Sequence, residues 1–313
     1  QKNCSSPNYN EGMVTMVSFA SDFTKNIGKH TATALSQRFQ KNPSEINSYL
    51  NSLFAHIDAM NANVNAVTSL EKERALTRGA ELSARKPAAH ESLFGVPVII
   101  KENIQKKGYS VECASNILKG YRGQFDATVV THLENAGAIV IGTANMDEFA
   151  MGSSSEHSRH GAVKNPHDVA CVSGGSSGGS AVACALGFAP LTLGSDTGGS
   201  VRQPAAYCGI YGFKPSYGRV SRYGLVAYGS SLDQVSPFAR SVADLDLIMS
   251  VMGKEDVHDA TTQLGSYKSV GGSDSLKGKK IGVLRSLLEK GLANNVTAEF
   301  TKLENAMKDR GAT

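Results

Sequence analysis

Two glycine-serine turns lie close together in the sequence and carry the residues best suited to chemistry. Residues 174–180 read GGSSGGS, and residues 198–200 read GGS. Glycine permits positive φ angles and lets peptide N–H groups approach a ligand closely, which a site that stabilises an anion requires. Between the turns, the small apolar residues 181–186 predict a tightly packed buried helix, and residues 190–193 predict a strand. We therefore predict an active-site floor here and not a flexible linker.

The first turn also satisfies G-x-S-x-G, the pattern around the nucleophile of α/β-hydrolases. That mechanism needs a histidine later in the chain, and His258 is the only one after Ser176. Because His258 lies in a strongly hydrophilic segment, we expect it on a surface loop, which is a poor support for a general base. A phosphate-binding P-loop is excluded, since neither turn is followed by Lys-Ser or Lys-Thr at the required position.

A lysine is the remaining group that could activate a serine. Residues 96–100 form an apolar segment that predicts a strand and ends at Lys101. From this segment alone, a strand-end lysine that reaches water stays open as an alternative. A lysine that is buried deeply enough to be neutral near pH 7 can instead take a proton from serine, and Ser–Lys pairs replace the Ser-His-Asp triad on several folds.

A metal site is a second chemical alternative. His157, His160, His167 and Cys171 fall within one short polar stretch. Their spacing matches none of the common zinc patterns, and the surrounding residues are polar. We therefore expect solvated loop side chains and no metal in this chain.

The apolar periodicity predicts the elements that must position these residues. Apolar side chains recur at three- and four-residue steps over 46–60, and a similar stripe lies beneath the charged residues of 71–85, so both stretches predict helices. A helix over 126–137 followed by a strand over 138–142 indicates the alternation of an α/β sheet. Farther along we expect a helix over 241–252, a strand over 280–284 and a helix over 297–310.

Composition bounds the class of protein. The 313 residues are 41% hydrophobic and 19% charged, which is typical of a globular chain, and no run approaches the roughly 18 apolar residues of a membrane helix. The net charge of +4 permits an RNA partner without requiring one. We predict a polar N-terminal arm over 1–30, a helical region over 31–90 and a core over 91–313.

Three segments together resemble the amidase signature family. They are residues 95–103 (GVPVIIKEN), 174–180 (GGSSGGS) and 194–204 (GSDTGGSVRQP). The family uses a Ser–cis-Ser–Lys triad, so the resemblance implies Ser200 as the nucleophile, Ser176 as the bridging serine and Lys101 as the base. The implied fold is α/β, with a mixed β-sheet core flanked by helices on both faces.

The resemblance also assigns an oxyanion hole to the second turn. The implied donors are backbone N–H groups, those of Thr197, Gly198, Gly199 and Ser200. Asp196 and Arg202 flank this turn, and we expect them to hold its shape without taking part in the chemistry. The sequence departs from the family at Ser173, where proline is usual, and at Glu102, where aspartate is more common.

Residues 211–228 and 230–234 narrow the resemblance to the A-type subunits of glutamyl-tRNA(Gln) amidotransferases. This implies a glutaminase that needs no cofactor of its own and works with a B-type subunit, together with a small third subunit. The B-type subunit would use ATP and Mg²⁺, with the ammonia released from glutamine, to convert Glu-tRNA(Gln) into Gln-tRNA(Gln). Family members continue beyond position 313, and the resemblance places the groups that hold the α-amino and α-carboxylate groups of glutamine there.

Two other functions stay open. A stand-alone amidase would act on small or acyl amides, and a non-catalytic scaffold subunit would only bind its partners. For location, the Asn-, Ser- and Lys-rich start, which lacks an initiator Met, leads us to expect a mitochondrial protein after presequence removal. A bacterial cytoplasm is the alternative.

Overall fold

The computed structural model describes residues 26–269, 271–272, 275–288 and 291–313. Residues 1–25 of the predicted arm lie outside this description. The chain divides into two compact units, one that extends to Tyr267 and one from Lys268 to Thr313. In the described part, no helix has both the length and the apolar character needed to cross a membrane.

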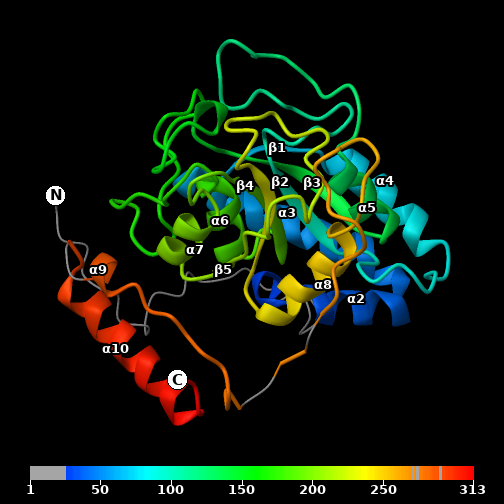
Figure 1. Ribbon diagram of the computed structural model, residues 1–313. Helices are drawn as coiled ribbons and strands as arrows, with labels where there is room; N and C mark the ends of the chain where they lie inside the picture. The colour runs from blue at the N-terminus through cyan, green and yellow to red at the C-terminus, as the bar shows by residue number, and fades with distance from the viewer. Residues whose placement is uncertain (1–25, 270, 273–274, 289–290) are drawn as a thin grey trace. The chain divides into compact units, whose positions relative to one another are not determined.

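A six-stranded mixed sheet forms the centre of the first unit (Figure 1), with the strand order β1-β3-β2-β4-β6-β5. The parallel strands are β2 (Pro97–Lys101), β3 (Ile139–Ala144) and β4 (Leu191–Asp196). Three pairs are antiparallel: β1 (Val67–Leu70) with β3, β6 (Gln234–Ala239) with β4, and β5 (Tyr211–Gly212) with β6. Every residue of β2, β3, β4 and β6 is buried, which explains why their sequences are mostly apolar and do not alternate.

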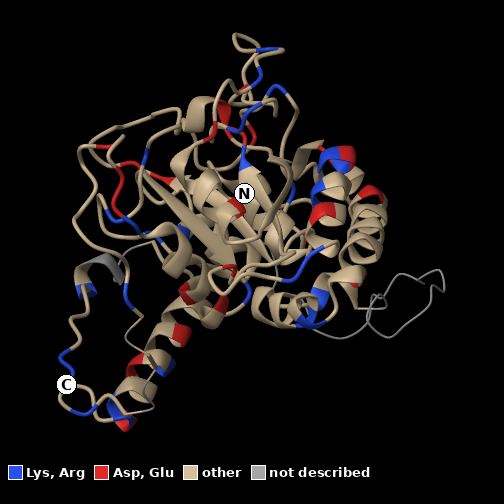
Figure 2. Cartoon of the chain, turned by 90° about the vertical axis from the view of Figure 1, so that its right-hand side faces the viewer, with Lys and Arg blue, Asp and Glu red and all other residues tan. Residues whose placement is uncertain are grey.

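Charge is nearly absent from these four central strands. Figure 2 shows acidic and basic residues interspersed along the helices and loops, with the strands largely uncharged. The two exceptions in β2, β3, β4 and β6 are Lys101 and Asp196, which end β2 and β4. Because β2 and β4 are parallel neighbours, their carboxyl ends meet at the same edge of the sheet. The fold therefore brings the predicted base and the second glycine-serine turn together.

Helices surround the sheet. In chain order they are α2 (Ala32–Lys41), α3 (Ile46–Val64), α4 (Lys72–Ser83), α5 (Thr128–Asn135), α6 (Gly178–Ala185), α7 (Arg202–Cys208) and α8 (Val242–Met252). Short 3₁₀ helices occur at Ile27–Lys29, Pro43–Glu45 and Glu148–Ala150. The α/β class and the mixed sheet are confirmed, as are the helices predicted over 46–60, 71–85, 126–137 and 241–252. In α3 the predicted apolar stripe is buried, which is why this helix packs on the rest of the unit.

Helix α6 follows the first glycine-serine turn and is the predicted buried helix. Its residues from Gly178 to Cys184 are all buried. Gly179 is required for close packing, because a Cβ atom there would lie 2.4 Å from the carbonyl oxygens of Ala66 and Asn145. The absence of a side chain thus lets α6 sit directly against the segments next to β1 and β3.

The second unit contains α9 (Arg285–Leu288) and α10 (Asn294–Asp309), and α10 confirms the helix predicted over 297–310. The strand predicted over 280–284 is wrong, since this segment has no strand structure. It lies beside Thr313: Ile281 N donates to Thr313 O, and Thr313 N donates to Lys279 O. Two such bonds do not make a ladder, so within the described residues this segment has no paired strand.

Candidate active site

Lys101 lies at the centre of the site and is completely buried. Its Nζ atom is 2.7 Å from Ser176 Oγ, 2.8 Å from Ser177 Oγ and 2.9 Å from Ser195 Oγ. These three contacts account for the three donors of a protonated amine. The alternative of a lysine that reaches water at the end of its strand is therefore wrong.

The buried environment of Lys101 makes its protonated form less favourable than it is in water. Burial lowers the pKa of Lys101 from 10.5 to about 7, although the negative charges of Asp147 and Asp196 act in the opposite direction. A pKa near neutrality suits a general base, because the group then accepts and returns protons readily at physiological pH. In the neutral state the nitrogen can accept the proton of one of its serine partners.

Ser176 belongs to the turn that precedes α6, and it is completely buried. The Gly175–Ser176 peptide bond is cis, as the family resemblance implies. The carbonyl oxygen of Ser176 accepts from Asp147 N at 3.2 Å, and Gly175 N donates to Gln203 Oε1 at 3.0 Å. The turn is thus fixed on both sides of the peptide that carries the predicted bridging serine.

Ser200 stands at the other glycine-serine turn and is the most exposed of the three predicted triad residues, at 9%. Its carbonyl oxygen accepts from Ser177 N at 3.2 Å, which places the two turns side by side. Within the described residues, the Ser200 hydroxyl forms no hydrogen bond with another side chain or with the backbone. The structure therefore joins Lys101 directly to Ser176 and brings Ser200 alongside through the backbone, with its hydroxyl available to a substrate.

Asp196 is hydrogen-bonded to the backbone of the second turn, next to which it was predicted to act as a support. It is fully buried and accepts hydrogen bonds from the backbone N–H groups of Gly199, Val201 and Arg202. Arg202 adds two side-chain bonds of 3.1 and 3.0 Å. Burial opposes ionisation of this carboxyl group, but the bonds from Arg202 and from the backbone outweigh it and keep the pKa of Asp196 low.

The predicted oxyanion donors differ in what they face. Gly199 N–H is directed at Asp196, at 2.9 Å. The N–H groups of Thr197, Gly198 and Ser200 donate to no described residue. A Cβ atom at Gly198 or Gly199 would meet nothing within 4 Å, so this side of the turn is open to an approaching carbonyl group. The geometry thus leaves three unused donors beside the Ser200 hydroxyl.

Ser177, Ser195 and Asn103 belong to the site but were not predicted from the sequence. Ser177 and Ser195 complete the set of hydroxyls around Lys101, and Asn103 Nδ2 donates to Ser195 Oγ at 3.1 Å. The sequence held a signal for Ser195, which is the residue before Asp196 on a strand that runs parallel to the one ending at Lys101. For Ser177 the signal was only its place next to Ser176.

An open cavity of about 330 Å³ lies beside the first turn. Its lining residues are Glu148, Phe149, Met151, Gly152, Ser153, Ser154 and His157. Gln203 links this wall to the turn, since its Nε2 donates to Ser153 O while its Oε1 accepts from Gly175 N. Gln203 thus connects the wall of this cavity to the residue that precedes Ser176.

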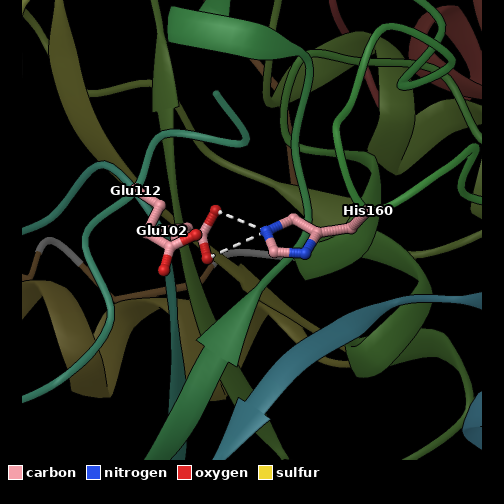
Figure 3. A group of neighbouring side chains, drawn as sticks. All are labelled: Glu102, Glu112 and His160. Atoms are coloured by element: carbon pink, nitrogen blue, oxygen red, sulfur yellow. Dashed lines mark hydrogen bonds and ion pairs between the residues drawn. The ribbon is translucent and has the colours of Figure 1, made fainter. Parts of the chain in front are cut away.

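Among the residues weighed as metal ligands, His167 has its Nε2 atom 2.9 Å from Cys208 O. His258, which was weighed as a general base, lies on an exposed loop as expected, with its ring centroid 4.8 Å from that of Tyr223. His160 instead meets two carboxylates, and Figure 3 shows its ring beside Glu102 and Glu112. One ligand atom from each of the three residues lies within 4.8 Å of the others.

Protein donors already occupy this carboxylate cluster. Glu102 accepts from Ala114 N at 2.8 Å, from Ser110 Oγ at 3.1 Å and from Thr68 Oγ1 at 3.2 Å. Glu112 forms an ion pair with Arg159. A positive guanidinium group next to Glu112 opposes a cation, so the cluster has the character of a network that ties loops to the end of β2.

The site thus contains a buried lysine and two glycine-serine turns at the carboxyl edge of an α/β sheet. The Amidase family model matches residues 48–313, and the chain belongs to this family.

Relatives place the chain more narrowly. It is 47% identical to the A-type subunit of glutamyl-tRNA(Gln) amidotransferase from Deinococcus radiodurans, over 90% of this chain and 58% of that protein. The crystal structure of the corresponding Thermotoga maritima protein superposes with a TM-score of 0.81 at 37% identity, over 92% of this chain and 61% of that one. An amidase family protein from Bacillus anthracis gives a TM-score of 0.82 at 31% identity, over 93% and 60%. The chain thus spans less than two thirds of the length of these relatives.

Proposed function

We propose that this chain is the glutamine-hydrolysing part of a tRNA-dependent amidotransferase, with Lys101, Ser176 and Ser200 as its triad. One observation carries the proposal. A fully buried lysine, whose pKa burial lowers to about 7, contacts Ser176 at 2.7 Å next to the turn that carries Ser200. The 47% identity to an A-type amidotransferase subunit supports glutamine as the amide that is cleaved.

The proposed reaction begins with proton transfer. Neutral Lys101 takes the Ser176 hydroxyl proton while Ser176 takes that of Ser200, and Ser200 Oγ attacks the carboxamide carbon of glutamine. The N–H groups of the turn stabilise the negative oxygen of the tetrahedral intermediate. The intermediate collapses, the C–N bond breaks, and the proton returns through Ser176 to the leaving ammonia. Water then attacks the acyl-enzyme along the same relay and releases glutamate.

The proposal extends to partners that the relatives' names imply. A B-type subunit, together with a small third subunit, would assemble with this chain. The B-type subunit would hold ATP and Mg²⁺ and act on Glu-tRNA(Gln), whereas this chain would need no cofactor. A mitochondrial location remains a proposal based on the composition of residues 1–30. The relatives from Deinococcus radiodurans and Picosynechococcus are bacterial, which supports the bacterial alternative.

Substitution of the nucleophile tests the proposal. In the full-length protein assembled with its partner subunits, Ser200→Ala should abolish ammonia release from glutamine and leave Gln-tRNA(Gln) formation with added ammonium intact. Ser250→Ala, at an exposed position on α8, is the matched control and should retain both activities. Glutamine hydrolysis that survives Ser200→Ala would show that another residue is the nucleophile.

A stand-alone amidase is the second candidate, and the similarity to the amidase family protein of Bacillus anthracis favours it. The purified chain without partners distinguishes the two functions. If it hydrolyses simple acyl amides faster than glutamine, the stand-alone function is correct. The third candidate, a scaffold without activity, would require that Lys101 and Ser176 be dispensable for every reaction of the complex.

A further inference from the structure

Asp233 is a buried carboxylate that the proposed reaction does not use. Its side chain is only 2% exposed and lies just before β6. It accepts from Thr197 Oγ1 at 2.5 Å, from Tyr228 N at 2.9 Å and from Gly229 N at 3.1 Å. In the described residues no cation pairs with it. A buried carboxylate of this kind is costly unless hydrogen bonds compensate it, so the structure depends on these three donors.

The pairing of β4 with β6 explains why Asp233 meets Thr197. Asp196 lies opposite Gln234 in this antiparallel pair, so the residues just beyond them, Thr197 and Asp233, are neighbours. Thr197 is the first residue of the turn that carries Ser200. Gly229 packs on the same side chain, because a Cβ atom there would lie 3.1 Å from Thr197 Cγ2.

The turn is therefore held by two carboxylates, one at each end. Asp196 binds its far end through Gly199 N, Val201 N and Arg202. Asp233 binds its near end through Thr197 Oγ1. Between these anchors lie Thr197 N–H and Gly198 N–H, two of the three donors that no described residue uses. Because the N–H of Thr197 belongs to the anchored residue, its direction depends on the contact with Asp233.

We propose that Asp233 is a positioning residue for amide hydrolysis, which acts through the Thr197 hydroxyl to aim the N–H groups of Thr197 and Gly198 at the oxyanion. The inference rests on the proposed role of Ser200 as the nucleophile. These donors bind the negative oxygen of the transition state more strongly than a neutral carbonyl. Loss of their alignment therefore lowers kcat and leaves KM nearly unchanged.

The test compares Thr197→Val, which keeps the shape and removes the hydroxyl, with Thr197→Ser, which keeps the hydroxyl. In the full-length protein with its partner subunits, Thr197→Val should lower kcat for glutamine by roughly 10- to 100-fold. This decrease is no larger than the one caused by removing one oxyanion-hole donor. Thr197→Ser should recover most of this loss. Asp233→Asn should behave like Thr197→Val, and the double variant should be no worse than either single variant, because both act through one contact.

Thr128→Val is a matched control away from the site. Thr128 Oγ1 makes the same kind of bond to a buried aspartate, Asp256, at 2.6 Å. If the loss of kcat reflected only general weakening of the fold, Thr128→Val would reproduce it. Equal kcat values for Thr197→Val and wild type, or equal losses for Thr197→Val and Thr197→Ser, would overturn the inference.

A second readout separates this inference from the proposed function. A fluorophosphonate reagent reacts when a serine Oγ attacks phosphorus, fluoride leaves and the phosphoryl oxygen occupies the oxyanion hole. Failure of the wild type to become labelled at Ser200 would contradict the proposed function itself. Labelling of the wild type and of Thr197→Val at the same rate would contradict only the role of Asp233 and Thr197. We expect labelling of Thr197→Val to be at least several-fold slower, and that of Thr197→Ser to be close to wild type.

Discussion

In the proposed reaction, Lys101 acts as a base without a carboxylate partner in direct contact. Its amine meets three serine hydroxyls, which solvate the proton-bearing form but provide no charge. Asp147 and Asp196 act only at longer range, and burial outweighs them. Had a carboxylate replaced one of the hydroxyls, the ammonium ion would have been stabilised and the amine would be a poor base at neutral pH.

The pKa of Lys101 predicts the pH dependence of the reaction. Because only the neutral amine accepts the serine proton, kcat/KM for glutamine should rise with pH and level off above about 7. Lys101→Arg should be inactive at every pH, since guanidinium stays protonated. A pH profile of initial rates checks this, and a rising limb retained in Lys101→Arg would assign the titration to another group.

The same pKa predicts how stability depends on pH. An unfolded lysine keeps its proton up to about 10.5, whereas buried Lys101 releases it near 7. The unfolded state therefore binds more protons between these values, and the free energy of unfolding should rise with pH across that window. In Lys101→Met this contribution should vanish. Urea unfolding at pH 7 and at pH 9.5 measures the difference, and an equal slope in both proteins would contradict a buried, neutral lysine.

The resemblance of three short motifs to the amidase signature family implied the triad, whose role stays a prediction. The sequence did not predict the polar neighbours of these residues. Ser195 and Asp233 reach the site through the pairing of β4 with its neighbours, and cross-strand register cannot be read from one strand alone. Their hydroxyl and carboxylate groups are common residue types with no local pattern of their own.

At the scale of elements, apolar runs and helical stripes in the sequence were sufficient to predict strands of the sheet and helices such as α3 and α8. They failed at residues 280–284, where a run typical of a strand forms no ladder with any described residue. A strand is defined by its partner, so an apolar run is a weaker signal than a helical stripe, whose hydrogen bonds are internal.

Helix α6 offers a test of how element packing supports the site. Gly179→Ala should destabilise the protein by about 1–3 kcal/mol, because the new methyl group meets backbone oxygens of two other segments, which cannot rotate away. The same change should slow glutamine hydrolysis, since α6 begins just after Ser176 and Ser177. Gly282→Ala is the control, because a Cβ atom there meets nothing within 4 Å. Thermal unfolding measures the stability of both variants, and equal melting temperatures would refute close packing at Gly179.

At the scale of the whole molecule, the residues of the proposed reaction all belong to the first of the two units. Every residue of the proposed triad and turns lies before Tyr267, where the first unit ends. Tyr267 itself closes that unit, because its hydroxyl donates to Asp246 at 2.7 Å and its N–H donates to Gly253 O. Residues 268–313 have contacts of their own, such as the ion pair between Arg285 and Glu304.

This division predicts that a chain ending at Tyr267 keeps the architecture of the site. Residues 1–267 contain all six strands and both glycine-serine turns, so the truncated protein should unfold cooperatively. Labelling of Ser200 by a fluorophosphonate reagent should proceed within a few-fold of the rate for the 313-residue chain. The same truncation with Tyr267→Phe should be less stable by about 1 kcal/mol, since it loses the bond to Asp246. Loss of cooperative unfolding, or labelling that falls more than tenfold, would mean that residues 268–313 support the site directly.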